Sequence, residues 1–200
     1  MDKVLVRNFI TQLNKLEGKE YLLSSIAYNI APTLTGIKPS SLISFSNIGK
    51  NIFGLWKDYK DDIGRALNVS FFELKETENS SLVLFYNTDM LHAYIASKKS
   101  RTFLKKMGYD ETMTLEQSLQ LLKVRFREMC PHEIGLFLGI PMEDVRGFIE
   151  HKGANFLFCK YWKVYHNVEE TKNLFQCYDK AKISVISSMM KVDLYDGVAV

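Results

Sequence analysis

Cysteine is scarce in this sequence, and its spacing is irregular. The three cysteines are Cys130, Cys159 and Cys177, and no two of them form a Cys-x-x-Cys pair. Three residues cannot complete a disulfide set, and Cys-x-x-Cys pairs are the usual mark of zinc ribbons and thioredoxin-like redox sites. We therefore expect reduced thiols, which excludes a disulfide scaffold and gives no support to a zinc site.

Long hydrophobic runs are also missing. Residues 1–8 lack the apolar core of a signal peptide, and no later run approaches the roughly 20 apolar residues that a membrane span needs. These absences predict a cytoplasmic protein without a membrane partner. The sequence has neither a Gly-rich phosphate loop nor a nucleophile elbow, so the common nucleotide-binding and hydrolase chemistries are not expected. Whether the chain is an enzyme stays open.

The excess of positive charge is small. A net charge of +3 at pH 7 does not by itself indicate a nucleic-acid partner. Basic residues nevertheless cluster between Lys98 and Lys106, where five lysine or arginine side chains occur with no acidic residue among them. Such a run is either a solvated helix face or a surface that docks an acidic partner protein such as a flavodoxin.

The apolar pattern predicts an α+β fold in one domain spanning residues 1–200. Residues 69–75 and 82–86 are rich in aromatic and branched side chains and flank a polar turn, which predicts an antiparallel hairpin. Short strands are expected near 41–46 and 161–165, and the second of these should join the sheet of the hairpin. About six to eight helices would pack around this small, mostly antiparallel sheet.

Residues 129–165 are rich in residue types that are rare in this sequence. They hold two of the four prolines, two of the three cysteines and one of the two tryptophans. Pro131 suits the first position of a helix, and His132 and Glu133 follow it. An imidazole beside a carboxylate can act as a general acid or base, so these two are the candidate catalytic residues. The alternatives are a hydrogen-bonded structural histidine and a glutamate that interacts with the helix dipole.

A metal site is not expected in this stretch. Neighbouring residues of a helix point about 100° apart, so His132 would need distant ligands such as His151 or His166. Cys130-Pro131 resembles the short pairs that present a thiolate to haem iron, and the simpler interpretation is that Cys130 is a small buried apolar side chain.

Residues 134–149 have the apolar spacing of a helix-turn-helix, with the turn at Pro141. The expected second helix begins with Glu143 and Asp144, whose negative charges would face DNA phosphates. Nucleic-acid binding is therefore the less favoured alternative.

Residues 160–165 mix lysines with aromatic rings. Alternation along a strand places Tyr161, Lys163 and Tyr165 on one side, opposite residues 160, 162 and 164. An aromatic and basic surface suits a flat anionic molecule such as a nucleotide or flavin. Trp162 is expected to fill core space instead.

Several motifs resemble an uncharacterised family of anaerobic Gram-positive bacteria that is known only as a domain of unknown function. The motifs are Pro-His-Glu-Ile-Gly-Leu-Phe-Leu-Gly at 131–139 and Trp-Lys-Val-Tyr at 162–165. Two shorter ones are Ala-Pro-Thr-Leu at 31–34 and Gly-Ile-Lys-Pro at 36–39. The resemblance implies no assigned activity, and it associates such genes with flavodoxin genes. The family often has His-Cys where this chain has Asn29-Ile30, and Phe where it has Cys130, which puts thiol chemistry at both positions in doubt.

These observations lead to one hypothesis about function. The segment 31–39 contains two prolines and a glycine and should be stiff enough to hold a lysine beside the turn at 131–133. The two segments together would bind a small anionic ligand or a cofactor of unknown identity. The protein would then be an accessory to flavin or iron redox metabolism. The expected ligand-binding residues are Lys38, Lys163, Tyr165 and Tyr161, with His132 and Glu133 as the catalytic pair. The alternatives are an interaction module that docks an acidic redox protein, and DNA binding.

Overall fold

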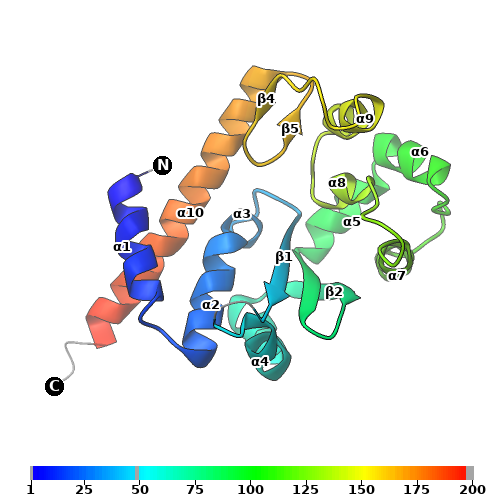
Figure 1. Cartoon of the computed structure of the whole chain (residues 1–200). Coiled ribbons are helices and arrows are strands. Elements are labelled where there is room, and N and C mark those ends of the chain that lie inside the picture. The colour runs from blue at the N-terminus through cyan, green and yellow to red at the C-terminus, as the bar shows by residue number, and fades with distance from the viewer. Residues whose placement is uncertain (1, 48–49, 197–200) are drawn as a thin grey trace.

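The computed structural model describes residues 2–47 and 50–196, which form a small antiparallel sheet with helices on both faces (Figure 1). The strands β1 (Ser40–Ser46), β2 (Ser70–Glu76) and β3 (Ser80–Tyr86) lie in the order β1-β3-β2. Both pairings are antiparallel. The α+β class, the predicted hairpin and the strand near 41–46 are confirmed.

The described residues contain ten helices, against the six to eight expected. Two of the ten, α3 and α8, are single turns of four residues, and this accounts for the difference. The helices are α1 (Lys3–Leu13), α2 (Gly18–Asn29), α3 (Ala31–Leu34), α4 (Ile52–Leu67), α5 (Thr88–Ala96), α6 (Lys98–Lys106), α7 (Leu115–Arg125), α8 (Ile134–Phe137), α9 (Met142–Glu150) and α10 (Val168–Asp196).

The sheet separates two hydrophobic cores. Successive side chains of a strand point to opposite faces, so Val83 and Phe85 of β3 pack with Trp56 of α4, whereas Leu84 packs with Leu122 of α7. All five side chains are buried. The alternation along β3 therefore fixes which helices cover each face.

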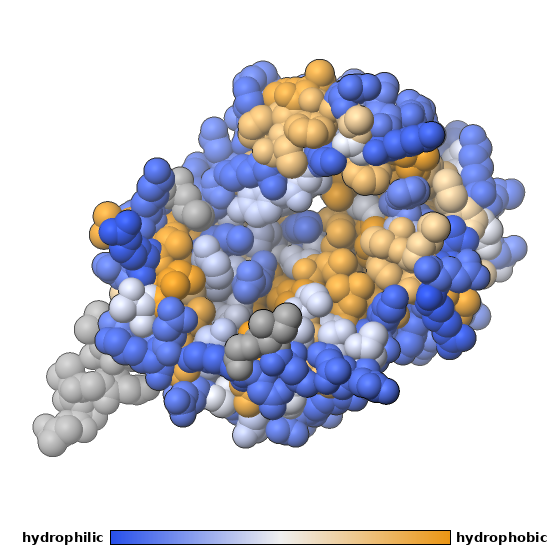
Figure 2. Space-filling view, viewed as in Figure 1, coloured by the Kyte–Doolittle hydropathy of each residue, from blue (hydrophilic) through white to orange (hydrophobic). Residues whose placement is uncertain are grey.

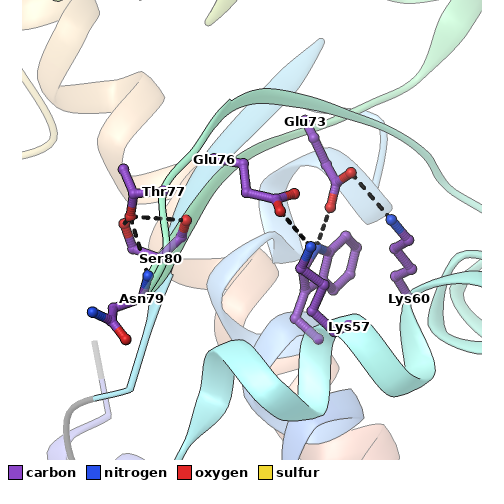
Figure 3. Close-up of polar contacts among 8 residues, drawn as sticks. Lys57, Lys60, Glu73, Glu76, Thr77, Asn79 and Ser80 are labelled. Atoms are coloured by element: carbon purple, nitrogen blue, oxygen red, sulfur yellow. Dashed lines mark hydrogen bonds and ion pairs between the residues drawn. The ribbon is translucent and has the colours of Figure 1, made fainter.

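The β2–β3 hairpin is held by polar contacts at its turn and along one edge (Figure 3). At the turn, Thr77 N donates to Ser80 O at 2.8 Å. Along β2, Glu73 accepts hydrogen bonds from Trp56 Nε1 at 2.9 Å and Lys60 Nζ at 3.1 Å. Because Trp56 and Lys60 belong to α4, these bonds connect that helix to the strand.

The predicted strand at 161–165 is wrong in extent and in partner. Only β5 (Lys163–Val164) is strand, and it pairs with β4 (Phe158–Cys159) in a separate two-stranded sheet. The chain reverses between them, where Lys160 N donates to Trp162 O at 3.3 Å. The side chains of residues 161–165 alternate because Trp162 and Val164 pack on a helix. They contact Phe175 and Tyr178 of α10 rather than a neighbouring sheet.

The long helix α10 crosses the molecule and contacts α1, α2 and α3 (Figure 1). Ile186 joins Phe9 and Leu13 of α1 in one small core, and the opposite end of α10 supports the β4–β5 hairpin. Within the described residues, no helix has the length and apolar character needed to cross a membrane.

Candidate functional site

A cavity of about 360 Å³ lies between the α8–α9 segment and the β4–β5 hairpin. Residues 130–132, Ile140 and Phe148 line one wall, and residues 159–163 line the other. The molecular surface is hollowed beneath β4 and β5, with hydrophobic residues on the side of α8 (Figure 2). The lining is mainly apolar and carries a few titratable groups, which is the composition of many small-molecule sites.

His132 is an exposed residue of the cavity wall. It lies just before α8 rather than in its first turn, because the helix begins at Ile134. The imidazole centroid is 5.6 Å from the centroid of the Phe148 ring on α9. His132 is therefore accessible both to solvent and to a molecule in the cavity.

Glu133 points away from the cavity into the core. Its side chain is 1% exposed, forms an ion pair with Arg125 Nε, and accepts a hydrogen bond from Tyr109 Oη at 3.3 Å. Burial, followed by the charge of Glu133, raises the pKa of Tyr109. Glu133 is the N-cap residue of α8, but its side chain makes no capping hydrogen bond and is engaged in the buried ion pair instead.

Lys163 and Tyr161 line the same cavity as His132. Lys163 Nζ donates to Gly153 O at 2.6 Å and lies 5.2 Å from the Phe156 ring centroid and 5.8 Å from that of Phe148. Tyr161 Oη donates to Asp179 Oδ1 at 2.9 Å. Burial raises the pKa of Tyr161, and the hydrogen bond to Asp179 adds to the rise. Both side chains are therefore held in place before any ligand arrives.

Tyr165 is not part of the cavity lining. Its ring stacks on that of His151 at 5.6 Å and packs against Gly147, where a Cβ atom would be 2.4 Å from Tyr165 Cγ. Gly147 is thus required for the close approach of α9 to the hairpin. The Tyr165 hydroxyl is buried and has no hydrogen-bond partner among the described residues.

Lys38 lies in the connection between α3 and β1 and is likewise absent from the cavity lining. Its Nζ is 5.9 Å from the Tyr178 ring centroid. Burial, reinforced by the nearby charge of Lys182, lowers the pKa of Lys38 to about 8. The structure therefore brings His132, Tyr161 and Lys163 together but directs Lys38 toward α10.

Asp144 is an organising residue that the sequence did not reveal. It is buried at 2% exposure, and its carboxylate accepts hydrogen bonds from Trp162 Nε1 at 2.7 Å, Tyr165 N at 2.7 Å and His166 N at 3.0 Å. These bonds join α9 to the β4–β5 hairpin and so connect the two walls of the cavity. The core role predicted for Trp162 is confirmed. No local motif signals the pairing, because its partners lie 18 to 22 positions away.

The cysteines and histidines do not form a metal cluster in the part of the chain that the structure describes. Cys130, Cys159 and Cys177 are free and exposed, so the buried role suggested for Cys130 is wrong. Partial burial and the charge of Glu133 raise the pKa of the Cys130 thiol, which disfavours its thiolate.

The helix-turn-helix spacing corresponds to α8 and α9. Glu143 and Glu150 are exposed on α9, and Glu143 pairs with Lys99 at 3.5 Å. Asp144 is buried, so it would not meet DNA phosphates as the sequence had suggested. The exposed acids still disfavour contact of this helix with a nucleic acid.

Comparison with known proteins gives one family match. A family model described as Protein of unknown function (DUF3793) matches residues 26–196, which is most of the chain. The searches of curated proteins and of solved structures found no match. The match covers the complete cavity wall from residue 130 to residue 163 as well as Lys38.

Proposed function

The chain belongs to the family described as Protein of unknown function (DUF3793), and we propose that it binds a small molecule with an apolar body and an anionic group. The cavity of about 360 Å³ between α8–α9 and β4–β5 is the observation that carries this proposal. Its apolar lining would cover the body of the ligand. Lys163 and the imidazole of His132 would face its anionic group.

The mouth of the cavity supports the proposal. Phe148, which lines the cavity, is 38% exposed, and Phe156, whose ring lies near Lys163 Nζ, is 43% exposed. Lys163 Nζ lies near both aromatic rings, so cation and aromatic faces occur together. A flat anionic molecule would cover these rings while it approached the ammonium group. His132 would donate a hydrogen bond to it or exchange a proton with it.

A fluorescence titration with the anionic aromatic probe 8-anilinonaphthalene-1-sulfonate tests this function. We expect saturable binding that weakens at least tenfold in Cys159→Trp, because the indole would occupy the cavity beside Lys160. Cys177→Trp is the matched control, since Cys177 is also an exposed cysteine but lies on α10 outside the cavity. Equal affinity in the two variants would exclude the cavity as the site.

A second candidate function rests on α6. Lys98, Arg101 and Lys106 are exposed along this helix, whereas Phe103 and Leu104 face the core. Lys99 and Lys105 form ion pairs with Glu143 and Glu111, which reduces the free positive charge. The remaining cations would dock an acidic partner such as a flavodoxin. Reversal of Lys98, Arg101 and Lys106 to glutamate should abolish such binding, and an unchanged, salt-insensitive affinity would refute it.

A further inference from the structure

Two lysines from distant parts of the chain converge on a group of tyrosine rings beside α10. Lys38 Nζ lies 5.9 Å from the centroid of Tyr178. Lys182 Nζ lies 4.9 Å from the centroid of Tyr28 and 5.3 Å from that of Tyr161. Both lysines are partly buried. The segment before β1, α2, α10 and the tip of the β4–β5 hairpin therefore meet around two ammonium groups.

Neither ammonium group has an acidic partner among the described residues. The nearby carboxylate of Asp179 is already engaged, because it accepts hydrogen bonds from Lys160 Nζ at 2.5 Å and Tyr161 Oη at 2.9 Å. Every ion pair found in the described residues involves other cations. A lysine loses hydration as its side chain is buried, so these two partly buried lysines without a carboxylate partner retain the capacity to bind an anion.

The two charges also oppose each other. Burial, followed by the charge of Lys182, lowers the pKa of Lys38 to about 8. Burial lowers the pKa of Lys182 as well, while Asp179 acts in the opposite direction. An anion placed between the two ammonium groups would offset both the repulsion and the loss of hydration.

We propose that Lys38 and Lys182 form a binding site for a phosphate-type oxyanion, held between the two ammonium groups within the ring of Tyr28, Tyr161 and Tyr178. A dianion matches the two positive charges, and each ammonium can donate several hydrogen bonds to its oxygens. The site adjoins the cavity of the proposed function, because the Tyr161 side chain borders both. Its oxyanion is either free phosphate or the phosphoryl group of a larger molecule.

The test is thermal unfolding of the full chain at pH 7 with increasing inorganic phosphate, compared with sodium chloride at equal ionic strength. Phosphate should raise Tm beyond chloride, because a ligand that binds only the folded state stabilises it. Lys38→Met and Lys182→Met should each weaken the phosphate affinity roughly tenfold or more, which corresponds to the loss of one charge-assisted contact. Lys180→Met is the matched control, because Lys180 is an exposed lysine of the same helix. A Tm rise that is equal in all four proteins, or no rise beyond chloride, overturns the proposal.

A measurement on the unaltered protein covers the case in which a variant does not fold. Acetic anhydride labelling, read by peptide mass spectrometry, should be slowed by phosphate at Lys38 and Lys182 but not at Lys180. Labelling that phosphate leaves unchanged at all three lysines contradicts the site. Comparison of phenyl phosphate with inorganic phosphate identifies the source of the anion: stronger protection of Lys38 and Lys182 by phenyl phosphate indicates the phosphoryl group of a larger molecule, and equal or weaker protection indicates free phosphate.

This experiment is independent of the cavity proposal. Cys159→Trp fills the cavity and should leave phosphate stabilisation unchanged. If that variant loses probe binding but retains the phosphate effect, both sites stand. If phosphate stabilises none of the proteins, the lysine site is refuted. The cavity proposal then still depends only on the binding of 8-anilinonaphthalene-1-sulfonate.

Discussion

The indole nitrogen of Trp162 donates a hydrogen bond to Oδ2 of Asp144 at 2.7 Å, and this bond joins the two walls of the candidate cavity. Trp162 lies at the turn of the β4–β5 hairpin, and Asp144 lies in the first turn of α9. The same carboxylate accepts hydrogen bonds from the backbone nitrogens of Tyr165 and His166. The shape of the cavity therefore depends on one buried side chain.

Replacement of Asp144 should destabilise the fold strongly. Asp144→Ala leaves the Trp162 indole and two backbone N–H groups without acceptors, and we expect a loss of about 3 kcal/mol in the free energy of unfolding. Urea unfolding followed by tryptophan fluorescence measures the loss. Glu143→Ala is the control, because its exposed carboxylate should contribute under about 0.5 kcal/mol. Equal effects of the two substitutions would contradict the role assigned to Asp144.

The buried pair of Glu133 and Arg125 gives a second prediction. Arg125→Ala would leave the Glu133 carboxylate in the core with only Tyr109 as a partner, which should cost about 3 to 5 kcal/mol in the free energy of unfolding. Arg127→Ala removes an exposed arginine two residues away and should be close to neutral. Chemical unfolding of both variants measures the difference. A small effect of Arg125→Ala would mean that solvent reaches Glu133.

Lys38 gives a prediction about pH. Its pKa is about 8 in the folded chain and lies near 10.5 when unfolded, so the unfolded chain binds more protons between these values. The free energy of unfolding should therefore rise with pH from 8 to 10.5. Lys38→Met removes the ammonium group, so the variant should not show this rise. At pH 7 its free energy of unfolding should exceed that of the original protein by about 2 kcal/mol. This figure is smaller than the full pKa shift implies, because the Lys38 side chain is partly exposed.

The comparison of the two proteins isolates Lys38 from other groups. Burial raises the pKa of Tyr178 and of Tyr161, which lowers stability above pH 10 in both proteins equally. The charge of Lys182, which helps to lower the pKa of Lys38, is also present in both proteins. Urea unfolding at pH 7, 8, 9 and 10 provides the curves. Parallel curves for Lys38→Met and the original protein would contradict the lowered pKa.

Local patterns in the sequence predicted the main sheet well. Residues 69–75 and 82–86 alternate over a full hairpin length, and the turn between them is polar, so nearest-neighbour information is sufficient. It was not sufficient at 161–165. There, aromatic and branched side chains alternate because Trp162 and Val164 pack on α10, and only two residues pair as strand. A short apolar alternation does not distinguish a neighbouring strand from a supporting helix.

The candidate site was predicted only in part. His132, Tyr161 and Lys163 were expected to share a surface, and all three line the cavity. Glu133 was expected to act beside His132, but its side chain pairs with Arg125, and no local motif identifies that partner. The approach of Lys38 to Lys182 joins positions 144 residues apart, and no local motif encodes such a contact.

Differential thiol labelling tests the cavity proposal most directly, because the chain carries its own control. Cys130 and Cys159 line the cavity and Cys177 lies outside it, and all three thiols are free and exposed. The reaction rate of each with iodoacetamide is measured by peptide mass spectrometry, with and without 8-anilinonaphthalene-1-sulfonate. We predict that the probe slows labelling of Cys130 and Cys159 several-fold and leaves Cys177 unchanged. Equal rates with and without the probe at Cys130 and Cys159, or equal slowing at all three cysteines, would contradict a binding site between α8–α9 and β4–β5.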